Sequence, residues 1–451
     1  MIVGRVNATD CSDSRFLQEK YMEPIQVVIA GLGPRGLNTY GNYQNLFPEN
    51  MKVVGAADID DEKLKLAQKS LSIDPSKCFH TAEEMFSVPK FAKVAVIATQ
   101  DSQHIKHAVM AMKQGYDLLL EKPIANKLED CLIIMNEALK LKRHVAVCHV
   151  LRYTTFYKTI KEIIDSGKIG EIASIDANEN VGYWHQSHSF VRGNWRNAEL
   201  SSPMILQKCC HDLDIFNFLT GKKCLVLSSY GSNMFFNSAN KPQGAADYCL
   251  DCKYCDECAF SAKKIYLSEN AMFEREWLCY VVAPPYPTKE KIKKALERGP
   301  YGRCVFACDN DVVDHQSVNM LYEGGATVHL TMSGFSEKCY RTIRITGTAG
   351  EVEGNQDTNI IRLIRFGEQP VYYDINKLAT DLSGHGGGDN EMMTELMHKL
   401  ASGGGDVSSS IVNSIRSHIM AFAAEKSRLN NGETINIDDF IAENGGAIDK
   451  N

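Results

Sequence analysis

A glycine-rich turn directly after an apolar run constrains this chain more than any other feature. The β-type run 27–30 leads into the pattern G-x-G-x-x-G over residues 31–36. Glycines at these places allow a sharp turn, close approach of a pyrophosphate, and tight packing of the following helix on the strand. The N-terminus of such a helix favours negative charge, because its N–H groups are unpaired. The pattern predicts a dinucleotide site, with an ordinary βαβ turn as the alternative, and the predicted contacts are Gly31, Gly33, Pro34, Arg35 and Gly36.

An acidic residue follows at the spacing that such a site requires. The second apolar run, 51–57, ends in Asp58, which lies 22 residues after Gly36. A carboxylate at the end of the second strand binds the 2′-hydroxyl of the adenosine ribose and repels a 2′-phosphate. Residues 59–62 add no Arg that would attract a phosphate. The sequence therefore predicts NAD rather than NADP.

Composition limits the class of protein. The 451 residues are 44% hydrophobic and 23% charged, as in ordinary soluble globular proteins, and their number suggests two or three domains. The net charge of -7 argues against nucleic acid or an anionic membrane as a partner. No apolar run approaches the length of a transmembrane helix, and the N-terminal residues lack the apolar core of a signal peptide. We expect a cytoplasmic protein whose 15 cysteines are mostly free thiols.

Residues 24–150 alternate strand and helix patterns, as a parallel doubly wound sheet requires. Residues 1–23 before them read as a flexible arm. Expected strands are 26–30, 52–57, 94–98, 117–120 and 144–148, and expected helices are 61–70, 102–114 and 127–141. Thr99 and Gln100 follow the third main run, so we expect them at the carboxyl edge of the sheet, where open α/β folds bind ligands.

In residues 151–435 longer strand-like segments replace the alternation of short strands and helices. This pattern predicts an α+β domain with an open, mostly antiparallel sheet. Expected strands are 171–181, 223–231, 312–322, 326–333 and 340–346, and expected helices are 155–165, 390–401 and 408–429. A Cys-rich insertion is expected at about 232–308. Asp389, after a Gly-rich loop, is predicted as a helix N-cap, and residues 436–451 read as a tail.

The segment Glu121-Lys122-Pro123 ends an apolar run at the expected cofactor edge. An ammonium there can polarise a substrate oxygen or shuttle its proton when its surroundings lower its pKa. Pro123 is a candidate for a cis peptide bond, which would aim Lys122 by a fixed turn. The alternative is an exposed lysine at a strand end.

A second constellation lies in the predicted helix around His211. Gln207 and His211 are four residues apart and share a helix face, as do His211 and Asp214 at a spacing of three. A neutral His is suited to take the proton of an alcohol while the carbon loses hydride. The alternative is a packed or solvated histidine.

These motifs, in this order and spacing, resemble the Gfo/Idh/MocA oxidoreductases, which include glucose–fructose oxidoreductase and inositol dehydrogenases. The resemblance extends over about residues 24 to 435 and includes the C-terminal segment 417–428. It implies that Lys122 belongs to the Glu-Lys-Pro motif and that His211 is the acid/base. It also implies that Arg152 and Tyr153 lie near the substrate, and that the outer face of the second sheet forms a homo-oligomer contact.

One position departs from the family pattern. Many members carry Asp four residues before the His, where this chain has Gln207. Gln can hydrogen-bond an imidazole and orient it, but it cannot supply the charge that stabilises imidazolium. We therefore expect Lys122 to carry more of the proton transfer here.

The insertion contains a regular cysteine run. Cys249, Cys252, Cys255 and Cys258 are spaced three apart, and Cys304 and Cys308 follow later. Four thiols at this spacing can close around zinc or line an iron–sulfur cluster. Some members of the family with a similar insertion have comparable cysteines before a segment like 260–262. The run predicts a structural zinc site, with free thiols or a disulfide as alternatives.

Weaker candidates surround the expected site. Residues 183–188 and 194–196 are rich in groups that bind carbohydrate, among them Trp195 and Arg196. The segment 314–316 and His385 could line the pocket or be structural, and we expect His104 to be structural.

Together these features predict an NAD-dependent oxidoreductase that transfers hydride to or from a hydroxyl-bearing carbon of a sugar, glycoside or cyclitol. Its substrate-binding residues would include Arg152, Tyr153, Trp195, Arg196, Gln207, His211 and Asp214. Two alternatives stay open. One is a glycosidase that uses NAD for transient oxidation and elimination, and the other is an inactive nucleotide-sensing regulator.

Overall fold

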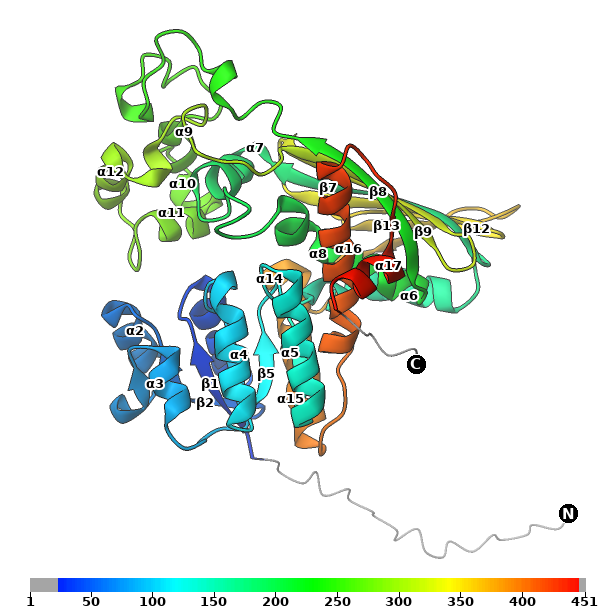
Figure 1. Ribbon diagram of the computed structural model, residues 1–451, viewed down its shortest axis with the longest axis horizontal. Coiled ribbons are helices and arrows are strands. Elements are labelled where there is room, and N and C mark those ends of the chain that lie inside the picture. The colour runs from blue at the N-terminus through cyan, green and yellow to red at the C-terminus, as the bar shows by residue number, and fades with distance from the viewer. Residues whose placement is uncertain (1–22, 446–451) are drawn as a thin grey trace, which may run out of the picture.

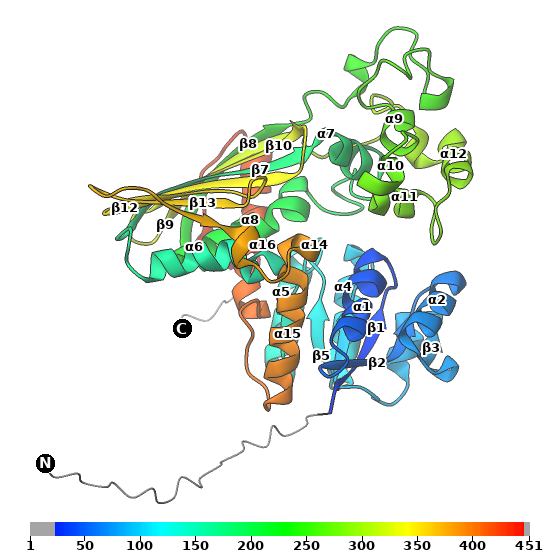
Figure 2. The same cartoon turned by 180° about the vertical axis from the view of Figure 1, so that it is seen from behind.

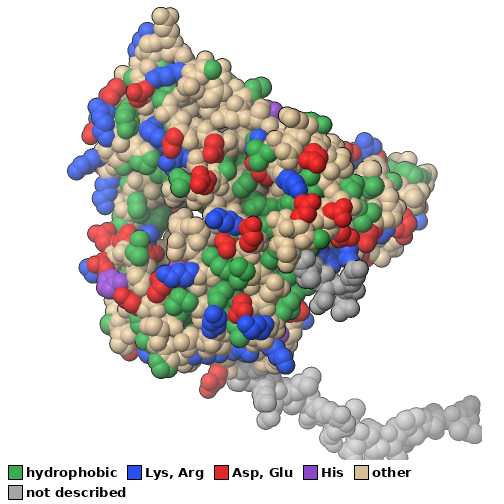
Figure 3. Space-filling model, in the orientation of Figure 1, with side chains coloured by type: hydrophobic (Ala, Val, Ile, Leu, Met, Phe, Trp, Pro, Cys, Tyr) green, Lys and Arg blue, Asp and Glu red, His purple; other side chains and the backbone are tan. Residues whose placement is uncertain are grey.

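The computed structural model describes residues 23–445 and builds them around two sheets (Figures 1 and 2). The arm expected at 1–23 lies outside the described residues except for Glu23. None of the described helices is apolar over a stretch long enough to cross a membrane. Lys and Arg side chains are interspersed with Asp and Glu over the face in Figure 3, without a large patch of one sign.

The first sheet is parallel and has six strands in the order β3-β2-β1-β4-β5-β6. This confirms the doubly wound sheet expected from the alternating pattern. The strands are β1 (Ile25–Ala30), β2 (Met51–Ala57), β3 (Cys78–Phe79), β4 (Val94–Ile97), β5 (Asp117–Leu120) and β6 (Val145–Val147). The strand order reverses between β1 and β4, the place where ligands bind in such sheets.

Helices cover both faces of this sheet. Those from the first half of the chain are α2 (Asp61–Leu71), α3 (Ala82–Ser87), α4 (His104–Lys113) and α5 (Leu128–Leu141). A late helix, α15 (Gly388–Ala401), returns to the sheet, where Met392 and Leu396 share a core with Val27 and Ile29. Figures 1 and 2 show α5 on one face and α15 on the other. Residues far apart in the sequence therefore meet at the carboxyl edge of β1.

The second sheet has nine strands in the order β14-β13-β12-β11-β7-β10-β9-β8-β15. Every neighbouring pair is antiparallel except β7 and β10, which confirms the expected mostly antiparallel sheet. The strands are β7 (Ile172–Gly182), β8 (Cys224–Ser232), β9 (His315–Tyr322), β10 (Thr327–Ser336), β11 (Tyr340–Gly347), β12 (Gly350–Asn355), β13 (Ile360–Arg365), β14 (Val371–Asp374) and β15 (Ile435–Asn436). One face packs on α6 (Thr155–Asp165), α8 (Met204–Thr220) and α16 (Ile411–Leu429).

The residues between β8 and β9 form short helices beside one end of the second sheet (Figure 1). They include η7 (Cys249–Asp251), α9 (Ala262–Tyr266), α10 (Ala271–Glu274), α11 (Glu276–Val282), α12 (Lys289–Arg298) and η8 (Pro300–Gly302). They have their own small core, centred on Tyr266, Leu278 and Ile292. This segment packs as a unit on η5 (Gln186–Arg192), the helical turn that follows β7 and α7 (Tyr183–His185). At the other end of the domain, residues 437–443 of the expected tail form helix α17 (Ile437–Glu443).

Candidate functional site

The three glycines of the first turn have different roles. Gly31 has φ +92°, and a Cβ on it would lie 2.4 Å from the Ala98 carbonyl oxygen. A Cβ on Gly36 would lie 1.8 Å from the Gly31 carbonyl oxygen, whereas a Cβ on Gly33 would meet nothing within 4 Å. Gly31 and Gly36 are therefore required by the fold itself, and Gly33 leaves an open face that a ligand can approach. The helical segment that follows is a wide π-type turn, η1 (Pro34–Gly41), continued by α1 (Asn42–Leu46).

Asp58 is fixed beside this turn at the carboxyl end of β2. Its Oδ2 accepts the Leu32 N–H at 2.6 Å, and its Oδ1 accepts the Asp60 N–H at 3.0 Å. The Lys63 ammonium lies 3.9 Å from Oδ1. This cation comes from the first turn of α2, one residue beyond the segment 59–62 considered in the sequence.

Glu121 belongs to a buried network that joins the first turn to α15. Its Oε1 accepts Arg35 Nε at 2.6 Å and a short hydrogen bond from the Tyr40 hydroxyl. Arg35 also pairs with Asp389, through NH2 to Oδ1 at 2.7 Å and NH1 to Oδ2 at 3.1 Å. Burial opposes ionisation of Glu121, but Arg35 and Lys122 hold the pKa of its carboxyl below the usual value. Both acids are therefore ionised, and Arg35 links the two halves of the chain.

The expected N-cap role of Asp389 is wrong. Helix α15 begins at Gly388, its N-cap is Gly387, and no side chain caps it. The carboxylate of Asp389 instead accepts Arg35 and His385, the latter from Nδ1 to Oδ2 at 2.9 Å. Sequence periodicity does not show this pairing, because it depends on α15 returning to the first sheet.

Lys122 joins the Glu-Lys-Pro segment to the helix that carries His211. The Lys122–Pro123 peptide bond is cis, as the sequence suggested. Lys122 Nζ donates to the Gln207 carbonyl oxygen at 2.9 Å, one helical turn before His211. The structure thus brings the lysine at the end of β5 next to helix α8 of the second domain.

His211 is buried on α8, in surroundings that favour a neutral ring. Burial, together with the nearby Lys122 and His149, holds the pKa of His211 well below its usual value. Its Nδ1 has no hydrogen-bond partner within the described chain. Gln207 does not orient it: the amide of Gln207 donates to the carboxylate of Asp101. Asp101 is a residue that sequence reasoning missed, since its link to α8 crosses between the domains.

His385 is the other imidazole at this place. Its ring centroid lies 6.2 Å from that of His211, and its side chain is 43% exposed. It stands in the left-handed region, with φ 50°, inside the Gly-rich turn α14 (Ser383–Gly386). His385 and Asp389 therefore form a hydrogen-bonded pair whose imidazole lies between His211 and the surface.

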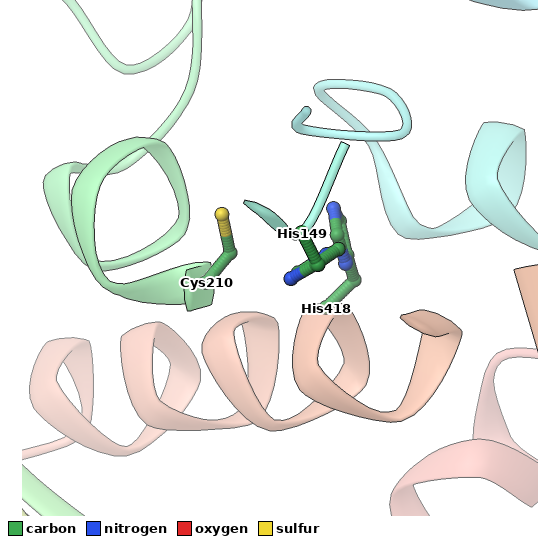
Figure 4. A group of neighbouring side chains, drawn as sticks. All are labelled: His149, Cys210 and His418. Carbon is green, nitrogen blue, oxygen red and sulfur yellow. The ribbon is translucent and has the colours of Figure 1, made fainter. Parts of the chain in front are cut away.

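A third group of side chains near His211 contains His149, Cys210 and His418 (Figure 4), whose ligand-type atoms all lie within 4.8 Å of one another. His418 Nε2 accepts the Ile124 N–H at 2.8 Å, and its Nδ1 faces the Ser414 carbonyl oxygen at 3.2 Å. Both nitrogens of His418 are thus engaged, which leaves too few ligands for a metal ion. The group is a packed wall behind His211.

A cavity of about 390 Å³, within the size range of small-molecule sites, lies next to His385, and neither Lys122 nor His211 is among its lining residues. His385 and Gly386 line one side, and Lys208 of α8 with Glu179 and Arg341 of the second sheet line another. The charges are paired: Glu179 lies 3.2 Å from Lys208 and 2.8 Å from Arg341, and Arg341 also pairs with Asp212. The cavity therefore offers many donors and acceptors with little net charge.

Arg152, Tyr153 and Asp214 are placed in the core beneath this site. Arg152 forms a two-pronged pair with Asp214, at 2.5 and 2.7 Å, and also donates to the Ser408 carbonyl oxygen. The Tyr153 hydroxyl and the Ser409 hydroxyl lie 3.0 Å apart. These groups join η4 (Val150–Tyr153), α8 and the segment before α16, and their contact with substrate stays a prediction.

The remaining candidates fall into two groups. Thr99 and Gln100 lie just beyond β4 at the carboxyl edge, and His104 joins this edge to the Glu121-Lys122-Pro123 segment, since its ring nitrogens face the carbonyl oxygens of Thr99 and Pro123. Others are engaged by the protein itself. Arg196 pairs with Asp309, Trp195 packs on Phe190, His188 stacks on Tyr301, Asp314 accepts the Phe235 N–H, and the Gln316 amide donates to Ser229.

The comparisons with known proteins agree with this architecture. A family model described as "Oxidoreductase family, NAD-binding Rossmann fold" matches residues 25–149, and one described as "Oxidoreductase family, C-terminal alpha/beta domain" matches residues 161–436. The chain is 24% identical over 388 residues to the Bacillus subtilis (strain 168) protein YteT, covering 82% of this chain and 88% of that protein.

Two solved structures show the same fold. Levoglucosan dehydrogenase in complex with NADH has a TM-score of 0.67 at 16% identity, covering 92% of this chain and 99% of that one. An inositol dehydrogenase homologue from Azotobacter vinelandii, complexed with NAD+, has a TM-score of 0.65 at 16% identity, covering 92% and 98%.

Proposed function

The chain belongs to the Gfo/Idh/MocA family of NAD-binding oxidoreductases, and from this premise we propose that it oxidises or reduces one hydroxyl-bearing carbon of a sugar, glycoside or cyclitol. The observation that carries the proposal is the meeting of Lys122 and helix α8. The ammonium at the carboxyl edge of the first sheet lies 2.9 Å from the carbonyl one turn before His211. This contact supports the proposal, because it sets the lysine after β5 beside the helix that carries His211.

The residues of the first turn fit a dinucleotide. Gly33 has no neighbour within 4 Å of the place a Cβ would take, so a pyrophosphate can approach the backbone there. Asp58 would accept the ribose 2′-hydroxyl, which favours NAD over NADP. Its two backbone hydrogen bonds hold the carboxylate in place for this contact. When bound, NAD supplies the acceptor or donor of hydride.

The protein's own groups handle the proton. During oxidation, the substrate hydroxyl gives its proton to His211, while Lys122 polarises the same oxygen. The lowered pKa of His211 makes the ring a weak base, so the step depends on Lys122, whose ammonium stabilises the alkoxide that develops on the substrate oxygen. His385 is the partly exposed imidazole next to His211, and its Nδ1 is hydrogen-bonded to the carboxylate of Asp389. The proton would therefore pass from His211 to His385 and then to solvent, which gives each imidazole a role in the reaction.

The substrate is proposed to occupy the cavity lined by Lys208, Arg341 and His385. The paired charges and the carboxamides of Gln356 and Asn359, which also line the cavity, suit hydroxyl groups, because a hydroxyl donates and accepts hydrogen bonds at once. The volume of about 390 Å³ leaves room for a group beyond the oxidised ring, which favours a glycoside.

The experiment combines the full-length protein and NAD with a panel of sugars, glycosides and cyclitols, and follows nicotinamide absorbance and product mass together. The proposal predicts reduced nicotinamide with a product two hydrogens lighter. Released aglycone without net reduced nicotinamide would indicate the glycosidase alternative instead. Tight NAD binding with no product from any substrate would indicate a regulator.

We also propose that the protein is a homo-oligomer formed through the second sheet. Large apolar side chains on its strands are exposed, among them Leu225 and Tyr230 of β8, Phe335 of β10 and Tyr372 of β14. Exposed apolar surface of this kind is typical of interfaces. Light scattering on the purified protein would give the mass, and a monomer would contradict this proposal.

A further inference from the structure

The Cys-rich insertion surrounds a small cavity whose wall carries five thiols. The cavity measures about 40 Å³. Four of the thiols come from the run 249–258, and the fifth, Cys304, comes from the segment that follows η8. All five are free cysteines, and Cys249, Cys255 and Cys304 are buried. Two segments about fifty residues apart in the sequence thus place sulfur atoms around the same cavity.

A buried guanidinium faces the same cavity without a carboxylate. Arg192, the last residue of η5, is 0% exposed and lines the cavity. Its Nε donates to the Arg303 carbonyl oxygen and its NH2 to that of Phe260, both at 2.7 Å, and NH2 also lies 3.5 Å from Cys249 Sγ. NH1 has no partner, and no described acid forms an ion pair with Arg192.

An isolated buried charge of this kind is costly unless an opposite charge compensates it. Neutral thiols do not provide that charge, whereas thiolates bound to a metal do. Four thiolates around Zn²⁺ carry a net charge of about −2, and cysteine-bound iron–sulfur clusters are also anionic. The position of Arg192 therefore indicates an anionic centre in the cavity.

We propose that this cavity holds a thiolate-bound metal centre, with Cys249, Cys252, Cys258 and Cys304 as its ligands and Arg192 as its counter-cation. Metal binding would deprotonate these thiols.

Cys255 is the thiol left out of this ligand set. Its sulfur lies 3.2 Å from the Ser261 hydroxyl, a closer contact than the 3.6 Å between Cys249 Sγ and the Arg303 carbonyl oxygen. The sequence run alone pointed to Cys255 as a ligand, but the fold brings Cys304 to the cavity as the fourth ligand instead.

The spacing of the thiols favours an iron–sulfur cluster over a single ion. Sulfur atoms around one zinc would lie about 3.8 Å apart, given Zn–S bonds of about 2.3 Å. Among the cysteines of the insertion, all of which the structure describes, no three sulfurs come within 4.8 Å of one another. A cluster tolerates this wider arrangement, because each thiolate binds a different iron.

The centre would tie the insertion to the segment between β7 and α8. Arg192 ends the turn that carries His188, and Tyr183 packs on Phe260 next to the cysteine run. Loss of the metal should therefore loosen the insertion without removing Lys122 or His211.

The test is elemental analysis of the full-length protein purified without oxygen and without chelators. We expect about four iron and four sulfide per chain, with a visible absorption band that reductant bleaches. One zinc per chain would support the thiolate-bound metal centre but would show that it holds a single zinc ion, not an iron–sulfur cluster. A metal-free protein, or one whose cavity thiols are paired as disulfides, would overturn the proposal.

Variants then test the ligand set by metal content and thermal midpoint. Cys258→Ser and Cys304→Ser should lose most of the metal and melt at a lower temperature than the wild type. Cys255→Ser and the exposed Cys339→Ser are matched controls that should keep the metal. Full metal content in both Cys258→Ser and Cys304→Ser would contradict the assignment. Neither outcome depends on the substrate, so failure here leaves the proposed oxidoreductase activity unaffected.

Discussion

Replacing Asp389 by Asn tests the link between the cofactor turn and the late helix α15. The carboxylate accepts two hydrogen bonds from Arg35 and one from His385. The amide of Asn keeps one acceptor oxygen but loses the charge. Arg35 keeps its contact with Glu121, so the guanidinium is not left wholly unpaired.

The expected cost follows from these contacts. Removing one partner of a buried ion pair costs about 3–5 kcal/mol, and a hydrogen bond to a charged group contributes about 1.5–3 kcal/mol. The Arg35 side chain is 30% exposed and Glu121 still pairs with it, so the cost should be nearer that of one hydrogen bond to a charged group than that of breaking a fully buried ion pair. We expect Asp389→Asn to lower the free energy of unfolding by about 2 kcal/mol at neutral pH.

The pH dependence gives a second, independent signature. Burial opposes ionisation of Asp389, but Arg35 and His385 hold the pKa of its carboxyl well below the usual value. A lowered folded-state pKa gives stability above the unfolded value of about 3.9, and that stability is lost as the pH falls through the folded-state value. The difference between wild type and Asp389→Asn should therefore narrow as the pH falls below about 4.

Urea unfolding at several pH values measures both effects. Glu391→Gln is the matched control, because Glu391 lies on the same helix and forms an exposed pair with Lys158 that contributes less than about 1 kcal/mol. If Asp389→Asn were as stable as Glu391→Gln at neutral pH, or if its deficit stayed constant into the acid range, the account of this network would be refuted.

Three further predictions concern the site directly. His211→Ala and Lys122→Ala should each lower kcat by about 10²- to 10⁴-fold with little change in the NAD Kd, and wild-type turnover in both would contradict their roles. Asp58→Ala should weaken the binding of NAD and reduce the protein's preference for NAD over NADP in a binding titration. Tighter binding of NADP than of NAD by the wild type would contradict the NAD assignment. Gly33→Ala should unfold like the wild type but bind NAD poorly, whereas Gly31→Ala should cost more than about 1 kcal/mol in unfolding free energy, because its φ is +92°. Equal effects of the two changes would refute the division of roles within the turn.

Local patterns predicted most of the fold. The five main strands of the first sheet and the long strands β7 to β11 follow apolar runs or alternation that the sequence shows directly. Strands β12 to β14 were not expected, because segments such as Gly350–Asn355 are short and combine glycine with charged residues. They form because β11 offers a free edge for pairing, which is a tertiary effect.

The site was predictable only where one motif supplies it. Lys122 and His211 stand in recognisable segments, and the fold brings those segments together. The contacts of Asp101 with Gln207 and of Arg35 with Asp389 depend on which elements meet across the domain boundary, and that of Tyr40 with Glu121 depends on tertiary packing within the first domain; no local pattern encodes them. Gln207 shows the limit most clearly, since its amide reaches Asp101 instead of the imidazole one turn away.

The most direct test of the central claim is a crystal structure of the protein with NAD bound. The account predicts the pyrophosphate over the turn at Gly33, the adenosine ribose on Asp58, and the nicotinamide ring next to Lys122 and His211. A nicotinamide ring far from both side chains, or no nucleotide at this edge of the sheet, would contradict it.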